Sequence, residues 1–175
     1  MSKPVQLLKT YLARQYTKLY PREMFIGVTG SVGKTACVNV CKAVLSQKYE
    51  TLTTTPGTDL PKTLLKLKPG IKKAVLEMGV EFQGDMDFYL SIIKPKIAVF
   101  TKISYAHVET LGDISGILKE KSKLVESLDE DGAVILNWDD PSSRKLAEAC
   151  KGSVLYYGMD PKNCTIWAGN VQVEN

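Results

Sequence analysis

The chain has 175 residues, long enough for one domain with a sizeable hydrophobic core and short for two. Apolar residues make up 44% and charged residues 24%, as in ordinary globular proteins, and the net charge of +4 is too small and scattered to indicate a nucleic-acid partner. No apolar run approaches the ~20 residues that span a bilayer and no signal peptide is visible, so we expect a cytoplasmic protein without a membrane partner.

The first predicted element is an amphipathic helix over residues 4–20. Its apolar residues recur at i, i+4 intervals: Leu8, Leu12, Tyr16 and Tyr20. The apolar side is rich in tyrosine and the charge density is modest, so we expect this helix to pack on the domain rather than on a membrane. We assign residues 1–22 to this helix and residues 23–175 to the domain that follows.

An apolar run over residues 25–29 passes directly into a glycine-rich loop that ends in Gly33-Lys34-Thr35. A phosphate-binding loop needs glycines where the backbone bends, a lysine that reaches the phosphates and a hydroxyl for Mg²⁺. Gly30, Gly33, Lys34 and Thr35 meet these needs. Residues 36–45 have helical spacing, so the loop would lie at a helix N-terminus, which favours phosphate. The alternative is a chance glycine-rich turn.

The four cysteines are Cys37, Cys41, Cys150 and Cys164. None of them forms a C-x-x-C pair. We expect reduced thiols, with a zinc site as the alternative.

The run from Ala74 to Leu76 predicts a short buried strand with Glu77 at its end. Preceding it we expect a strand over 49–54, a turn over 55–58 and a helix over 60–67. A carboxylate at the end of a neighbouring parallel strand faces the metal in phosphate-loop enzymes, which makes Glu77 a candidate Mg²⁺ ligand. A glutamate at a strand end can also be merely solvated.

Residues 97–101 predict another buried strand, and the loop after it carries His107, the single histidine of the chain. A lone histidine is more often a structural residue than a ligand. In open α/β sheets, however, ligands bind outside the carboxyl ends of the strands, where this loop would place His107.

The following helix has one apolar stripe: Ile114, Ile117, Leu118, Leu124, Val125 and Leu128. Lys121 falls in the middle of that stripe, and we expect Lys119, Glu120, Lys123 and Glu126 to lie off it. A buried lysine has a lowered pKa and is paired, modified or functional, whereas the alternative is a side chain whose ammonium reaches solvent. A neutral amine there can react with CO₂ to give a metal-binding carbamate.

The last third predicts strands over 133–136, 154–157 and 165–173, and a helix over 142–149. Asp140 is the expected N-cap of that helix, with Pro141 at its first position. Asn137 ends a strand and can serve as a turn residue or hydrogen-bond an adenine. Alternating strands and helices predict a three-layer α/β fold with a mostly parallel sheet.

The phosphate loop departs from the general pattern at Val28, where that pattern has glycine. The form Thr29-Gly30-Ser31-x-Gly33-Lys34-Thr35 resembles the ATP loop of the Mur ligases, which add amino acids or dipeptides to peptidoglycan precursors. Other matching segments occur in the family's order: Val75 to Gly79, Ala106 to Gly112, the Lys121 helix and Ile135 to Asp140. This resemblance implies the P-loop NTPase-like central ATPase domain of a Mur ligase.

The resemblance also implies roles for individual residues. The implied ATP-binding residues are Thr29, Gly30, Ser31, Val32, Gly33, Lys34, Thr35 and Asn137. The implied metal ligands are Thr35 and Glu77 for one Mg²⁺, and His107 and carbamylated Lys121 for a second metal. The implied catalytic residues are Lys34, His107 and Lys121.

The implied reaction is amide formation, in which a substrate carboxylate takes the γ-phosphoryl group of ATP and an amine displaces phosphate from the acyl phosphate. The family's uridine-nucleotide and amine-bringing domains are expected in a longer chain or a partner, and we expect this chain alone to be inactive. Residues 54–59 stand where the family has an Asn-rich segment, which leaves the acid substrate open. Two alternatives are a non-catalytic ATP-binding module and a small-molecule kinase.

Overall fold

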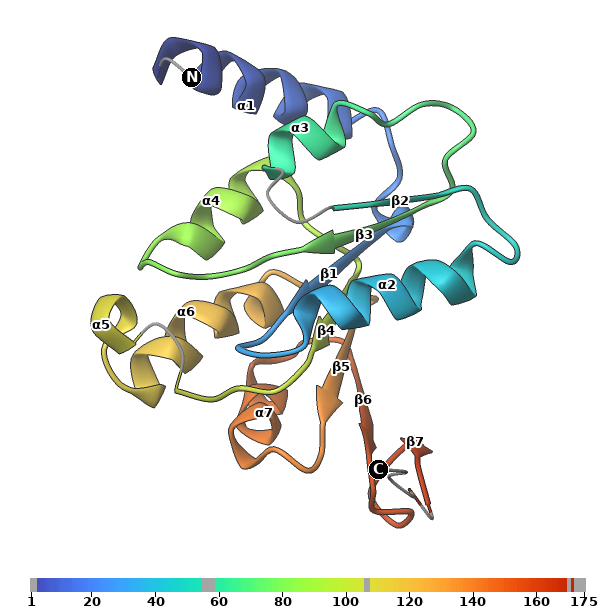
Figure 1. The fold of residues 1–175 in the computed structure, drawn as a ribbon, viewed down its shortest axis with the longest axis vertical. Helices are drawn as coiled ribbons and strands as arrows, with labels where there is room; N and C mark the ends of the chain where they lie inside the picture. Colours follow the sequence, from blue (N-terminus) through green and yellow to red (C-terminus); the bar gives the residue numbers. More distant parts are fainter. Residues whose placement is uncertain (1–2, 55–58, 106–107, 170, 172–175) are drawn as a thin grey trace, which may run out of the picture.

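Within the part of the chain that the structure describes, seven parallel strands form one sheet with helices on both faces (Figure 1). The computed structural model describes residues 3–54, 59–105, 108–169 and 171. The strands are β1 (Phe25–Thr29), β2 (Thr51–Thr53), β3 (Lys73–Glu77), β4 (Ile97–Phe100), β5 (Ala133–Asn137), β6 (Ser153–Gly158) and β7 (Ile166–Trp167). The helices are α1 (Lys3–Thr17), α2 (Lys34–Leu45), α3 (Leu60–Leu64), α4 (Asp85–Ile92), α5 (Val108–Leu111), α6 (Ile114–Glu126) and α7 (Pro141–Lys145), with 3-10 helices η1 (Arg22–Met24) and η2 (Leu146–Ala149).

The strands are buried on both faces because alternate residues point to opposite helical layers. On β1, Ile26 and Val28 pack against Val38 of α2. Phe25 faces the other way, into a cluster formed with α1, α3 and α4. Farther along that second face, Leu124 of α6 packs over β4 and β5. The predicted three-layer α/β fold is confirmed, and every strand pair is parallel.

The strand order is β2-β3-β1-β4-β5-β6-β7, and the connections between strands change direction between β1 and β4. After β1 the chain adds β2 and β3 on one side, and it then crosses to the other side for β4. Open α/β sheets bind ligands at such a point, outside the carboxyl ends of the strands. The fold therefore assigns a ligand position to the loops that follow β1 and β4.

The N-terminal helix differs from the sequence prediction in its length and in its buried face. It ends at Thr17, and Leu19 and Tyr20 donate backbone hydrogen bonds three residues back, which is turn geometry. Tyr16 packs as predicted, but Leu8 is 57% and Leu12 46% exposed, so their predicted packing on the domain is wrong. A tertiary contact explains the difference. The Thr17 hydroxyl donates to Ile92 O at 3.1 Å, so the face of the helix that carries Thr17 packs on the domain.

Other elements are shorter than the sequence predicts. α3 ends at Leu64 because Lys66 and Leu67 donate to carbonyls three residues back, and the helix predicted over 142–149 divides into α7 and η2. The strand predicted over 165–173 is only Ile166–Trp167 within the described residues. The turn predicted over 55–58 lies outside them.

Candidate functional site

The glycine-rich loop joins β1 to α2 at the carboxyl edge of the sheet. Gly33 is the N-cap of α2 with φ 85°, a conformation that favours glycine. Gly30 has φ 145°, and a Cβ there would collide with the Thr101 hydroxyl. The backbone therefore requires glycine at both positions, and the N–H groups of the first turn of α2 remain available for an anion.

The loop is fastened to the segment that follows β4. Ser31 N donates to Lys102 O at 2.7 Å, and the Ser31 hydroxyl donates to Ser104 O at 2.9 Å. At the loop's other side, the buried Thr29 hydroxyl donates to Met78 O at 2.7 Å, just after β3. These bonds hold the loop in place before any ligand binds.

Thr35 and Glu77 meet at the start of α2. The Thr35 hydroxyl donates to Glu77 Oε2 at 2.8 Å, and Glu77 is fixed in turn by its own N–H, which donates to the Thr54 hydroxyl at 2.8 Å. A hydroxyl and a carboxylate are hard oxygen ligands, and Mg²⁺ commonly takes one or two such groups together with phosphate oxygens and waters. This pair fits a magnesium ion carried by a nucleotide. Thr54 was missed by the sequence analysis because its partner lies on another strand.

Two lysines approach the loop from different elements. Lys34 Nζ donates to Ser31 O at 3.4 Å and Lys121 Nζ donates to Gly30 O at 3.2 Å. The side chain of Lys121 is buried, as its place in the apolar stripe of α6 predicts. Burial, followed by the nearby charge of Lys34, lowers the pKa of Lys121 from its usual 10.5 to about 8, while Glu120 acts in the opposite direction.

Glu120 was expected off the buried stripe, and the structure corrects this prediction. Only 3% exposed, it accepts hydrogen bonds from the N–H groups of Gly84 and Met86, both at 3.0 Å, at the start of α4. Its other oxygen pairs with Lys123 at 2.5 Å. The signal was present in the spacing, because Glu120 stands three residues after Ile117 and four before Leu124.

At the end of β5, Asn137 uses its amide oxygen to accept from Asp139 N at 3.0 Å. Asp140 caps α7 as predicted, accepting from Ser142 N, and it also accepts from Ile103 N at 2.7 Å. The second bond, which joins α7 to the segment after β4, was not predicted. His107 lies outside the described residues.

The four cysteines are free thiols. Among the described residues no group of three or more His, Cys, Asp or Glu side chains is gathered as metal ligands. The zinc alternative therefore gains no support from the described part of the chain. Nor does any helix of that part have the length and hydropathy needed to cross a membrane.

The family model described as Mur ligase middle domain matches residues 28–175. The chain belongs to the Mur ligase family. The predicted resemblance is thereby confirmed. A Bacillus subtilis protein named UDP-N-acetylmuramoyl-tripeptide–D-alanyl-D-alanine ligase is 36% identical over 140 residues, which are 78% of this chain and 29% of that protein. The Escherichia coli protein of the same name is 35% identical over 118 residues, which are 65% of this chain and 26% of that protein.

Solved Mur ligase structures share this architecture. MurF from Acinetobacter baumannii superposes with a TM-score of 0.81 and 27% identity, over 87% of this chain and 35% of that one. MurF from Thermotoga maritima in complex with ADP gives a TM-score of 0.79 and 26% identity, over 87% of this chain and 36% of that one. The chain spans about a third of the length of these relatives, so the Mur ligase domain corresponds to their central part.

Proposed function

We propose that this Mur ligase domain binds ATP and Mg²⁺ for the joining of a carboxylate to an amine. The observation that carries the proposal is the Thr35–Glu77 hydrogen bond of 2.8 Å at the N-terminus of α2, directly after the glycine-rich loop. A loop of this form, a helix N-terminus and two hard oxygen ligands are the parts that a magnesium-bound nucleotide requires. ATP with its metal supplies the phosphoryl group that activates the carboxylate.

The roles of the loop residues follow from their positions. The backbone from Thr29 to Thr35 would surround the phosphates, and Lys34 would neutralise charge on the terminal phosphates. Thr35 and Glu77 would hold the metal. Asn137 would contact the adenine, from the carboxyl end of β5.

Lys121 and His107 are proposed for a second metal. The buried amine of Lys121 has a lowered pKa and can become a carbamate, which converts a cation into an anionic oxygen ligand. The support for His107 is its place in the sequence after β4.

The names of the relatives suggest the finer reaction. We propose that the carboxylate substrate is a UDP-MurNAc peptide in peptidoglycan precursor synthesis, that D-alanyl-D-alanine is the amine acceptor, and that the reaction occurs in the cytoplasm. Because the chain spans only part of those relatives, the other ligase domains would come from a longer chain or a partner, and residues 23–175 would supply the nucleotide-binding unit.

Calorimetric titration with ATP, with and without Mg²⁺, tests the proposal. We expect binding that requires Mg²⁺ and that weakens by at least about tenfold in Lys34→Ala, because a charge-assisted phosphate contact contributes about 1.5–3 kcal/mol. Lys48→Ala replaces an exposed lysine in the turn that follows the far end of α2; it is the matched control and should bind normally. Equal affinity in Lys34→Ala and the intact chain would refute the site, and tight binding without metal would favour a non-catalytic ATP module.

A further inference from the structure

α1 presents a row of apolar side chains to solvent, opposite the face that packs on the domain. Ala13 and Thr17 are buried, whereas Leu7 is 71% and Tyr11 60% exposed. The row consists of Val5, Leu7, Leu8, Tyr11 and Leu12. Single exposed apolar residues are ordinary, but a contiguous row on one helix marks an interaction surface.

An apolar groove continues this row on the side of α3. Its volume is about 470 Å³, and it is lined by Leu12, Gln15, Tyr16, Leu19 and Leu65. Leu19 is the most exposed of its three leucines. The groove widens the apolar surface beyond the helix itself.

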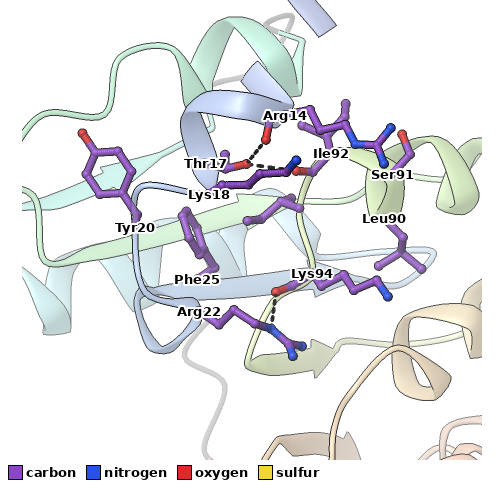
Figure 2. A pocket seen from close by; sticks show the side chains of 11 residues that line it. Arg14, Thr17, Lys18, Tyr20, Arg22, Phe25, Leu90, Ser91, Ile92 and Lys94 are labelled. Carbon is purple, nitrogen blue, oxygen red and sulfur yellow. Dashed lines mark hydrogen bonds between the residues drawn. The ribbon is translucent and has the colours of Figure 1, made fainter. Parts of the chain in front are cut away.

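A basic pocket flanks α1 on its other side (Figure 2). It has a volume of about 510 Å³, and its cationic lining residues are Arg14, Lys18, Arg22 and Lys94. None of the 11 described residues that line it is acidic. Arg22 is held by Lys94 O at 3.1 Å, Pro95 O at 3.2 Å and Asp129, so the exposed Arg14, Lys18 and Lys94 provide the charge that faces solvent.

The charge of this surface limits what can cover it. Residues 3–17 contain basic residues and no Asp or Glu. Two copies of the chain meeting through this face would bring like charges together, which disfavours a homodimer. The complementary surface is therefore apolar and anionic at once. α1 also lies at one end of the molecule, away from β7, where it can meet a flat surface (Figure 1).

We propose that α1 docks this domain on the surface of an anionic lipid bilayer. The apolar row enters the boundary between headgroups and acyl chains, and the cations of the basic pocket bind lipid phosphates. The helix lies on the membrane and does not cross it. This proposal revises the sequence-based expectation of no membrane partner, because Leu8 and Leu12 face solvent and do not pack on the domain. This docking goes beyond the proposed ligase function and does not depend on it.

Cosedimentation of the whole chain with vesicles tests the docking. We expect binding to vesicles of equal parts phosphatidylglycerol and phosphatidylcholine, little binding to phosphatidylcholine alone, and weaker binding at high salt. Arg14→Gln with Lys18→Gln should weaken binding about 25-fold, since each cation near an anionic surface contributes about fivefold. Leu7→Gln with Leu8→Gln should weaken it by at least about tenfold.

The matched control is Val40→Gln with Val44→Gln on α2, where the two valines are 64% and 66% exposed, and it should bind vesicles normally. Lys34→Ala should also bind vesicles, so loss of nucleotide binding and loss of docking are distinguishable. Thermal unfolding of each variant identifies any that fails to fold. Equal binding to neutral vesicles, no binding, or full binding by both α1 variants would overturn the proposal, as would a dimer that Leu7→Gln with Leu8→Gln dissociates.

Discussion

The chemistry of Lys121 depends on its surroundings. Its amine lies 3.2 Å from Gly30 O in a buried position, and burial is the main cause that lowers its pKa to about 8. At about pH 8, therefore, about half of such amines are neutral, whereas an ordinary lysine, with a pKa of 10.5, is almost fully charged. Only the neutral amine reacts with CO₂, and the reaction forms an N–C bond and releases a proton.

We therefore expect a carbamate on Lys121 when the chain is held in ¹³C-labelled bicarbonate. Its occupancy should rise from about pH 7 to about pH 8.5, as the amine loses its proton. Carbon NMR measures the carbamate signal. Lys121→Arg should lack this signal and Lys119→Arg, an exposed position on the same helix, should retain it. A signal that persists in Lys121→Arg would assign the carbamate elsewhere.

Among the helices, α6 contacts both the glycine-rich loop and the start of α4. Lys121 reaches the glycine-rich loop after β1, and the neighbouring Glu120 accepts from Gly84 N and Met86 N at the start of α4. α4 follows β3, the strand that carries Glu77. α6 therefore helps to position both the glycine-rich loop and α4, the helix that follows β3.

Glu120→Ala should lower the free energy of unfolding by about 1–3 kcal/mol, because it leaves two N–H groups of α4 without their acceptor in a buried place. Glu120→Gln keeps an acceptor oxygen, so its free energy of unfolding should fall by less. Urea denaturation measures both variants.

Glu126→Ala is the control, since it removes an exposed carboxylate from the same helix. We expect its unfolding free energy to change by less than about 0.5 kcal/mol. An equal loss in Glu120→Ala and Glu126→Ala would refute the capping role.

At the level of the whole molecule, helices cover the two faces of the sheet unevenly. In the described clusters α2 packs on the face that contains Ile26 and Val28, while α1, α3, α4 and α6 share the opposite face. Stability should therefore depend strongly on the second face. Leu124 of α6 is fully buried there, near Gly27 at the centre of the sheet.

Leu124→Ala should lower the free energy of unfolding by about 2–5 kcal/mol through lost burial and the cavity that remains. Leu7→Ala makes the same chemical change at an exposed position of α1 and should cost less than about 0.5 kcal/mol. Denaturation in urea compares the two. A small loss in Leu124→Ala would mean that this face collapses around the cavity or contributes little.

Features with a local signal could be predicted from the sequence alone. The glycine-rich loop, Glu77 at a strand end and the buried place of Lys121 follow from residues within one element, because helical and strand periodicity are properties of short segments. The packing of the elements could not be predicted in this way: it turns Leu8 and Leu12 to solvent and buries Glu120 against α4. It also brings the Thr54 hydroxyl to Glu77 N and the Asp140 carboxylate to Ile103 N. These contacts join segments far apart in the chain, so their partners are set by how the elements pack.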